Sequence, residues 1–263
     1  MVLSEEDLCK IECDGFFLVD QVDLSIGPYY YKFAGAGEIF RELLGSKVFK
    51  MVGIKCAEYE YLPQKKCLMS KDLNSEQIMY TPSSFGMKGV TLYDVYMGIE
   101  RGRFNNPDQV KLSIEIMHFI DLLFSNIDRH ISNFGFYIDE AGNVVLALLD
   151  NECFLKYYDK ATRPMYVEEG ERIDSMSFMR TSKKKEAEVF LSNISFELKE
   201  LIPKYLEMFS PSRVESIITG IEMELGMEFP NKRYNMRKYK RNYSMICGLL
   251  KVKKKSFMKT LVK

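Results

Sequence analysis

Histidine is scarce in this sequence, and paired cysteines and long hydrophobic runs are missing. The chain of 263 residues has two histidines, which are too few for most histidine-based metal sites. Its six cysteines show no CxxC spacing, so reduced thiols are expected instead of a zinc site. No window approaches the roughly 18 apolar residues of a membrane-spanning helix, and the acidic first ten residues lack the apolar region of a signal peptide. We therefore expect a cytoplasmic protein.

The charge of the whole chain is zero, with 37 basic and 37 acidic residues, but it is unevenly distributed. Residues 231–263 hold 12 basic and no acidic residues, which leaves residues 1–230 with a net charge of −12. Three interpretations of this basic tail stay open. It packs the apolar residues Ile246, Leu249, Leu250 and Val252 on the body, it contacts an anionic partner such as nucleic acid or an acidic protein, or it lies on anionic lipid.

The first part of the chain is predicted to contain short strands and one helix. Residues Glu38–Val52 place apolar side chains with a period near 3.6, and Gly53 follows as a helix stop. Aromatic and β-branched runs predict strands at Phe16–Val19, Tyr29–Phe33, Ala57–Leu62 and Cys67–Ser70.

The rest of the chain is predicted to be mostly helical. Gln109–Phe124 is apolar on most sides and is expected at a domain centre. Further helices are expected at Thr91–Ile99 and within Ala187–Gly226, and a hairpin at Phe134–Ile138 and Val144–Leu149. This order indicates an α+β fold with a β-rich lobe at 1–73, a helical lobe at 74–230 and a tail at 231–263 that is part of the helical lobe or packed on it.

Three polar residues around the hairpin form the most informative constellation. Asp128 and Asn133 lie between the buried helix and the hairpin, and Asp150 ends the returning strand, which can bring it back beside Asn133. Carboxylate and amide oxygens suit Mg²⁺, and a separate aspartate can orient an attacking hydroxyl. The catalytic loop of protein kinases has an aspartate and an asparagine separated by four residues, and a second aspartate follows after the next hairpin. The spacing therefore favours phosphoryl transfer.

The same stretch resembles a known family. The segment NIDRHISNFGFYID and the later LLDNECFL are similar to the catalytic region of HipA-like kinases, in their Firmicute and phage-type form. Upstream, YYYKFAGAGEIFRELLGSKVFKMVGI is similar to the strand lysine and helix glutamate of this family, and CLMSKDL to the segment that links its lobes. The resemblance covers about residues 28–155.

The resemblance implies a two-lobed protein-kinase-like fold and an ATP- and Mg²⁺-dependent bacterial Ser/Thr protein kinase. It assigns Asp128 as the catalytic aspartate, Asn133 and Asp150 as the metal ligands, and Lys32 as the phosphate-binding lysine that pairs with Glu42. The main-chain groups that would meet the adenine belong to Cys67, Leu68, Met69 and Ser70. An antitoxin-like partner is expected from the same resemblance, whereas the protein substrate is not indicated by the sequence.

Several alternatives stay open within this hypothesis. Glu38, one helical turn before Glu42, is a second candidate to pair with the lysine. Arg129 and His130 either order the catalytic loop or contact the nucleotide. A convincing Gly-rich phosphate loop is missing, and Glu152 replaces the glycine that usually follows the metal aspartate. These departures keep open a degenerate kinase that acts as an interaction module, and the D-R-H-x-x-N loop with the basic tail also fits a phosphoinositide-kinase-like lipid kinase.

Overall fold

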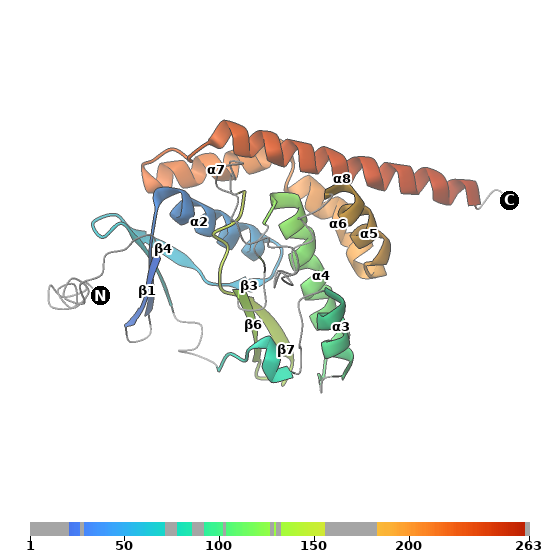
Figure 1. The fold of residues 1–263 in the computed structure, drawn as a ribbon, viewed down its shortest axis with the longest axis horizontal. Helices are drawn as coiled ribbons and strands as arrows, with labels where there is room; N and C mark the ends of the chain where they lie inside the picture. Colours follow the sequence, from blue (N-terminus) through green and yellow to red (C-terminus); the bar gives the residue numbers. More distant parts are fainter. Residues whose placement is uncertain are drawn as a thin grey trace, which may run out of the picture.

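Two β-sheets and a group of helices make up the computed structural model (Figure 1). The structure describes residues 21–26, 29–71, 78–85, 92–101, 104–126, 129, 133–155 and 183–260. The predicted strand Phe16–Val19, Asp128 and His130 lie outside these ranges. In chain order the elements are β1 (Gln21–Ile26), β2 (Tyr29–Ala34), α2 (Ala36–Met51), β3 (Lys55–Cys56), β4 (Tyr59–Leu62), β5 (Cys67–Lys71), η1 (Pro82–Phe85), α3 (Leu92–Arg101), α4 (Pro107–Phe124), β6 (Phe134–Ile138), β7 (Val144–Leu148), α5 (Lys183–Asn193), α6 (Phe196–Met208), α7 (Pro211–Leu225) and α8 (Lys232–Thr260).

The N-terminal sheet is antiparallel and has the order β1-β2-β5-β4. The strands predicted at 29–33 and 67–70 are confirmed as β2 and β5. Strand β1 was not predicted, although Val22, Leu24 and Ile26 alternate with polar residues as in a half-buried strand. Because β2 lies between β1 and β5, the lysine that it carries is held in an interior strand.

Helix α2 packs against this sheet and confirms the helix predicted at 38–52. Its apolar residues Ile39, Phe40, Leu43, Leu44, Val48 and Phe49 are all buried. At its N-terminus the Gly35 N–H donates to the Glu38 carboxylate at 3.0 Å, which satisfies one of the free donors of the first turn. Gly53 follows the helix with a φ of 78°, a left-handed conformation that suits glycine.

A second sheet joins the two parts of the molecule. Strand β3 pairs in parallel with β7, and β7 pairs with β6 in the predicted hairpin, which is confirmed. The connection continues beyond the strands: the Ala57 N–H donates to the Leu148 carbonyl at 3.0 Å, and the Tyr59 hydroxyl donates to the Leu149 carbonyl at 3.1 Å. The end of β7 is therefore fixed against the segment that follows α2.

The buried centre of the helical part is α4, as its apolar sequence predicts. Its last residue, Phe124, stacks on Phe154 with ring centroids 5.0 Å apart and also contacts Phe209 and Tyr239. Helices α5, α6 and α7 confirm the helical prediction for 187–226, and Pro211 is the first residue of α7.

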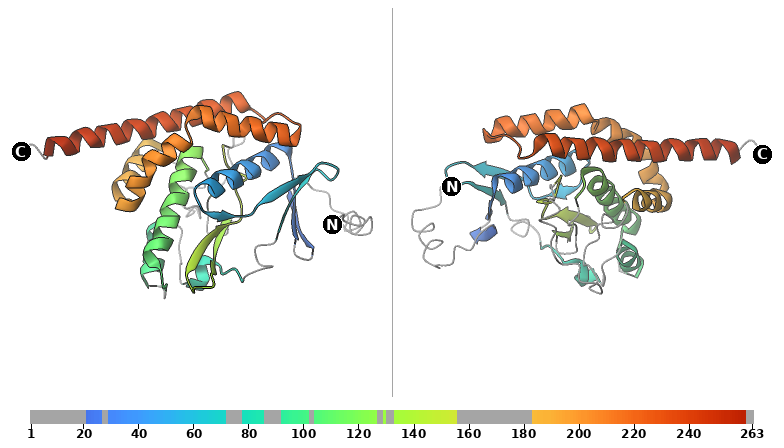
Figure 2. Two further views of the ribbon diagram at one scale, coloured as in Figure 1. Left: turned by 180° about the vertical axis from the view of Figure 1, so that it is seen from behind. Right: turned by 45° about the horizontal axis from the view of Figure 1, so that its top comes forward.

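Helix α8 is part of this helical group. Figures 1 and 2 show it running along α7 and across the top of the molecule, with its C-terminal part extending beyond the other helices. Of the apolar tail residues predicted to pack on the body, Ile246 and Leu249 are buried and Leu250 is half-buried. The packing interpretation of the tail is therefore confirmed for these residues, whereas the side chain of Val252 lies outside the described set. Among the described helices, none is long and apolar enough to cross a membrane.

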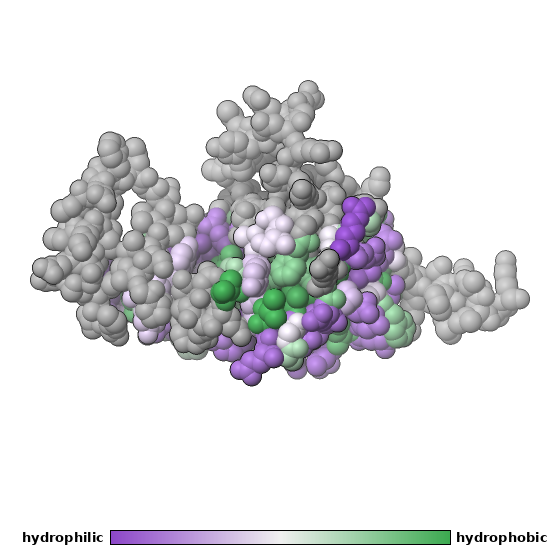
Figure 3. Space-filling view, turned by 90° about the horizontal axis from the view of Figure 1, so that it is seen from below, coloured by the Kyte–Doolittle hydropathy of each residue, from purple (hydrophilic) through white to green (hydrophobic). Residues whose placement is uncertain are grey.

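The face opposite α8 has a mixed surface. Figure 3 views it from below and shows a small group of hydrophobic residues near its middle, bordered by hydrophilic residues. Large exposed hydrophobic residues elsewhere in the described ranges are few, and Ile78, Phe196 and Met223 are the most exposed. Most of the apolar residues that the structure describes thus lie in the core.

The anchoring of α8 leads to the first prediction. The buried Asn242 side-chain amide donates to the carbonyls of Leu122 and Leu123 and to the Ser125 hydroxyl, which together end α4. Asn242→Ala leaves these acceptors buried without their donor, so we expect the free energy of unfolding to fall by about 1–3 kcal/mol. The exposed Ser244→Ala on the same helix is expected to change it by less than about 0.5 kcal/mol. Urea unfolding measures both, and equal effects would contradict the prediction.

Candidate active site

A buried ion pair joins β2 and α2. The Lys32 ammonium lies 2.6 Å from the Glu42 carboxylate, and both residues are almost fully buried. Lys32 reaches α2 because the helix begins two residues after β2 ends, which sets the second helical turn over the strand. Glu38, the alternative partner, instead accepts from the Gly35 N–H at the start of the helix. The structure thus pairs Lys32 with Glu42.

Two further carboxylates face the same ammonium. Asp150 lies 3.5 Å and Glu152 lies 3.4 Å from the Lys32 nitrogen. Burial alone would lower the pKa of Lys32, but the charges of Glu42 and Asp150 outweigh it and raise that pKa above its usual value, so the lysine stays charged. Three carboxylates around one cation leave this cluster with an excess of acidic groups.

The carboxylates of the cluster differ in proton affinity. Burial and the nearby charge of Asp150 raise the pKa of Glu42 well above its usual range, against the opposite effect of Lys32. Burial would also raise the pKa of Asp150, but a hydrogen bond with Glu42 and the charge of Lys32 outweigh it and hold that pKa below its usual value. Of Glu42 and Asp150, Asp150 therefore has the lower pKa. Its side chain, 30% exposed, is also the most accessible of the three carboxylates.

The hairpin brings Asn133 to the same place. The Leu149 N–H donates to the Asn133 carbonyl at 3.0 Å, so the residue before β6 and the residue after β7 are neighbours across the ladder. Asp150 is the next residue along the chain, and Asn133 is mostly buried beside it. The main chain brings Asn133 and Asp150 close together, as the sequence suggests. The catalytic role predicted for Asp128 falls on a residue outside the described ranges.

Arg129 holds this part of the site together. Its Nε and Nη2 donate to the two carboxylate oxygens of Asp121 at 3.0 and 3.2 Å. Its Nη1 donates to the carbonyls of Asp150 at 2.6 Å and Asn133 at 3.4 Å, and Nη2 also donates to the Asn151 side-chain oxygen at 2.8 Å. All five donors of the guanidinium thus have acceptors within the protein, and the side chain is fully buried. Of the two roles left open, the structure supports ordering of the loop for Arg129.

Asn151 connects the Arg129 network to the ion pair. Its main-chain N–H donates to the second carboxylate oxygen of Glu42 at 2.9 Å. On its other side it packs against Gly45 of α2 so closely that a Cβ atom at Gly45 would lie 2.3 Å from the Asn151 Cβ. Helix α2 can therefore approach the end of β7 only because residue 45 has no side chain.

The four residues predicted to meet the adenine lie on β5. This strand pairs with β2 on one side and with β4 on the other, so its main-chain groups are placed between two strands. Cys67, Leu68 and Ser70 are buried, and Met69 is half-buried. The adenine contact of these four residues stays a prediction.

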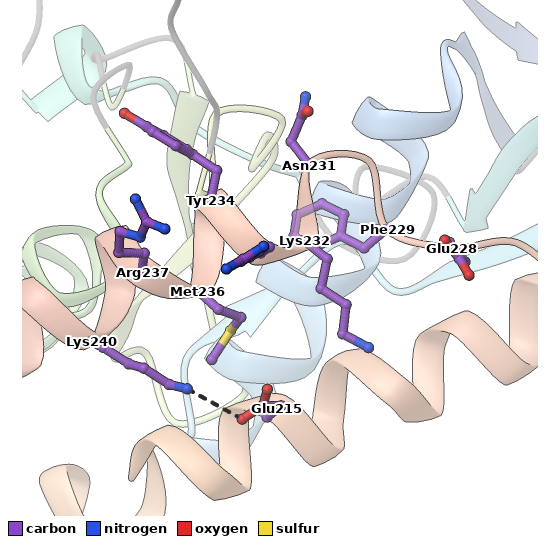
Figure 4. Close-up of a pocket in the computed structure, with 10 residues that line it drawn as sticks. Glu215, Glu228, Phe229, Asn231, Lys232, Tyr234, Met236, Arg237 and Lys240 are labelled. Atoms are coloured by element: carbon purple, nitrogen blue, oxygen red, sulfur yellow. Dashed lines mark ion pairs between the residues drawn. The ribbon is translucent and has the colours of Figure 1, made fainter.

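A large cavity lies away from these residues. It has a volume of about 990 Å³ and lies between the start of α8 and α7 (Figure 4). Lys240 points across it to Glu215 at 3.6 Å, and Lys232 lies 2.5 Å from Glu222. Because acidic residues of α7 pair with these lysines, the cavity lacks a strong excess of positive charge. The chemistry-bearing residues are around Lys32 instead.

Comparison with known proteins was made at the levels of sequence and structure. No family model matches the sequence, and no curated protein matches it either. The structure resembles that of the proinflammatory kinase CtkA of Helicobacter pylori, with 18% identity over 89% of each chain and a TM-score of 0.51. It also resembles HipA of Shewanella oneidensis MR-1, solved with HipB and operator DNA, with 12% identity over 94% of this chain and 70% of the other and a TM-score of 0.56. The chain has a HipA-like kinase fold.

The HipA-like kinase fold confirms the predicted fold class, a small β-rich lobe followed by a larger helical lobe. Three contributors to the site were nevertheless missed by the sequence analysis: Asp121, Gly45 and the contact of Glu152 with Lys32. Asp121 carried a usable signal, because an acidic residue in a helix that is apolar on most sides needs a cationic partner. The other two depend on distances between segments far apart in the chain.

The close contact of Gly45 with Asn151 leads to the second prediction. Gly45→Ala forces the end of β7 away from α2, so we expect a loss of stability of about 1–3 kcal/mol and weaker nucleotide binding. Gly220→Ala in α7 is the matched control, because its added Cβ would meet no atom within 4 Å and is expected to stabilise the protein by up to about 1 kcal/mol. Thermal unfolding of both variants checks the difference in sign, and a Gly45→Ala protein as stable as the wild type would refute it.

Proposed function

We propose that the chain is an ATP- and Mg²⁺-dependent kinase that transfers the γ-phosphoryl group of ATP to a serine or threonine of a protein. The observation that carries the proposal is the cluster of Lys32, Glu42 and Asp150, in which a buried lysine is held by a helix glutamate beside an ionised aspartate. The HipA-like kinase fold supports it. The protein substrate is not indicated by the site.

The donor atoms near the hairpin fit Mg²⁺. This ion prefers hard oxygen ligands and takes one or two of them from protein, with phosphates and water completing its shell. Asp150 offers a carboxylate and Asn133 an amide oxygen at adjacent main-chain positions. Within the described ranges there is no group of three or more His, Cys, Asp or Glu residues that could hold a metal ion by itself. When bound, the ion would neutralise charge on the phosphates.

The residues of the chain would contribute mainly by position and charge. Lys32 is fixed by Glu42 and would place its ammonium at the phosphates, since a lysine serves as a point charge for such groups. Asp128, five residues before Asn133, would orient the attacking hydroxyl and accept its proton. His130 would order the loop between them. Preorganised charge of this kind accounts for much of the acceleration in phosphoryl transfer.

The contacts of α8 weigh against the lipid-kinase alternative. Its described apolar residues Tyr239, Ile246 and Leu249 are buried against the other helices, so they are not available to enter a bilayer. Amphipathic helices that bind membranes need such an apolar face as well as basic residues. Measurements of nucleotide binding and of phosphoryl transfer distinguish the degenerate interaction module from the proposed kinase.

The third prediction tests phosphoryl transfer. Asp150→Asn and Lys32→Met are expected to lower the incorporation of labelled phosphate from ATP by at least about 100-fold, because each removes a charge at the reacting groups. Asp108→Asn, an exposed aspartate on the first turn of α4, is the control and is expected to retain wild-type activity. Autophosphorylation or transfer to a generic protein substrate provides the measurement. Equal labelling by the wild type and Asp150→Asn would disprove the proposal, and the absence of any labelling or ATP binding would favour the degenerate module.

We also propose that α8 contacts an anionic partner. Exposed basic residues on one side of α8, here called the α8 basic face, are Arg233, Arg237, Lys240, Arg241 and Lys251. The first three also line the cavity beside α7. These residues are separated by three or four positions, or by about a whole number of helical turns, so they lie on one side of the helix. The solved HipA of Shewanella oneidensis MR-1 was captured with HipB and operator DNA. An antitoxin-like protein and duplex nucleic acid are therefore the partners to test.

The fourth prediction concerns duplex DNA. Replacing Arg233, Arg237 and Arg241 by alanine is expected to weaken binding to a DNA duplex. The slope of the logarithm of the binding constant against the logarithm of the salt concentration is expected to become shallower by about one for each lost phosphate contact. A control that removes Lys199, Lys204 and Arg213, which are exposed on α6 and α7, changes the net charge equally. Fluorescence anisotropy at several salt concentrations distinguishes the two. If both triple variants behave alike, the α8 basic face has no specific role.

A further inference from the structure

Helix α2 has an aromatic support on the side away from Lys32. The ring of Phe40, in the second turn of the helix, stacks on the ring of Phe229 with centroids 4.1 Å apart and an interplanar angle of 16°. Both side chains are almost fully buried. Glu42 follows Phe40 by two residues, so their side chains leave the helix about 200° apart. Phe229 therefore contacts α2 on the side opposite to that from which Glu42 reaches Lys32.

Phe229 belongs to the α7–α8 corner, which is defined here as residues 226–231 between the end of α7 and the start of α8. Its main-chain N–H donates to the Glu222 carboxylate at 3.0 Å, and the other oxygen of that carboxylate accepts from the Lys232 ammonium at 2.5 Å. The Lys232 N–H in turn donates to the Phe229 carbonyl at 3.1 Å. The main chain of Phe229 is thus fixed to the last turn of α7 and to the first residue of α8.

A second contact between α7 and α2 is an ion pair at the surface. The Lys47 ammonium lies 2.9 Å from the Glu224 carboxylate, and both side chains are exposed. Exposed pairs of this kind contribute little to stability, because they are hydrated and screened by salt. Buried aromatic rings contribute more, since they combine a large apolar contact with a preferred geometry. Of the two contacts, the stack of Phe40 on Phe229 is therefore the one that fixes the position of α2.

A cavity borders the α7–α8 corner. It is the cavity of about 990 Å³ between α7 and the start of α8, and Phe229, Asn231 and Lys232 are among the residues that line it (Figure 4). The corner is thus packed against α2 and also borders open space into which it can shift. A shift of this kind would withdraw the ring that supports Phe40.

We propose that Phe229 is a positioning residue for the nucleotide site. Its ring sets the place of Glu42, and through Glu42 that of the Lys32 ammonium. Glu42 also accepts from the Asn151 N–H, so a displacement of α2 would alter the turn after β7 as well. The inference rests on the proposed function. It makes the site depend on a residue of the α7–α8 corner that lies on the far side of α2 from the predicted phosphate-binding lysine.

The experiment measures the affinity for ATP in excess Mg²⁺ by calorimetry. Phe229→Leu removes the ring but stays apolar, and we expect the affinity to fall at least about fivefold, the lower end of typical couplings between separate sites. Phe40→Leu removes the other ring of the stack and is expected to have a similar effect. The matched control is Phe190→Leu, which alters a buried ring on α5 that contacts His118 of α4. It is expected to change the affinity by less than about twofold, because distant sites act independently.

A double-mutant cycle tests whether Phe229 acts through the ion pair. Glu42→Gln replaces the carboxylate by an amide at almost constant shape. Because the ring acts by placing Glu42, Phe229→Leu is expected to change the ATP affinity of the Glu42→Gln protein by less than about twofold. A role of Phe229 in stability alone would give the same change in both backgrounds.

The outcomes distinguish this inference from the proposed function. An unchanged affinity in Phe229→Leu, an equal loss in Phe190→Leu, or equal changes in both backgrounds of the cycle would each overturn the role of Phe229 and leave the proposed kinase intact. Absence of ATP binding by the wild-type protein in excess Mg²⁺ would overturn the proposed function and this inference with it. Thermal unfolding without ligand verifies that each variant is folded, and Phe229→Met takes the place of Phe229→Leu where the latter is not.

Discussion

The candidate active site depends on the buried guanidinium of Arg129. Its five donors tie the end of α4, through Asp121, to the main chain at both ends of the β6–β7 hairpin. Burial raises the pKa of Asp121 and the charge of Arg129 opposes this shift, so the two groups depend on each other in an apolar interior. Separating such a pair typically costs about 3–5 kcal/mol. The positions of Asn133 and Asp150 are thus coupled to the stability of the helical core.

One carboxylate connects the lysine of the N-terminal sheet with the end of the β6–β7 hairpin. One oxygen of Glu42 accepts from Lys32 of the N-terminal sheet, and the other accepts from the Asn151 main chain at the end of the hairpin. Because Asn151 also accepts from Arg129, which donates to the Asp150 carbonyl, Lys32 and the predicted metal-binding Asp150 are held by one continuous set of hydrogen bonds. Any displacement of α2 changes both ends of this set together. The site is therefore preorganised without a bound nucleotide, which is the arrangement that electrostatic catalysis requires.

The sequence was sufficient for the parts of this site that depend on local pattern. The hairpin pattern returns Asp150 to Asn133, whereas the pairing of Lys32 with Glu42 came from the family resemblance, with Glu38 left open as a second candidate. Contacts between distant segments could not be predicted in this way. The fit of Gly45 to Asn151 depends on how closely α2 approaches β7, which no periodicity encodes. The adenine contact predicted on β5 came from the resemblance of CLMSKDL to the family's linking segment, and no local pattern in the sequence bears on it.

The zero net charge of the chain results from two regions with separate physical roles. Around Lys32, three carboxylates surround one cation. On α8 several basic residues are exposed, whereas the buried Asn242 bonds to Ser125 at the end of α4, three residues before Asp128. This hydrogen bond consequently connects α8 to the end of α4, which precedes the predicted catalytic aspartate. A partner bound to the α8 basic face would contact the helix whose Asn242 bonds to the end of α4. The tail and the site therefore belong to one structural unit although their charges are opposite.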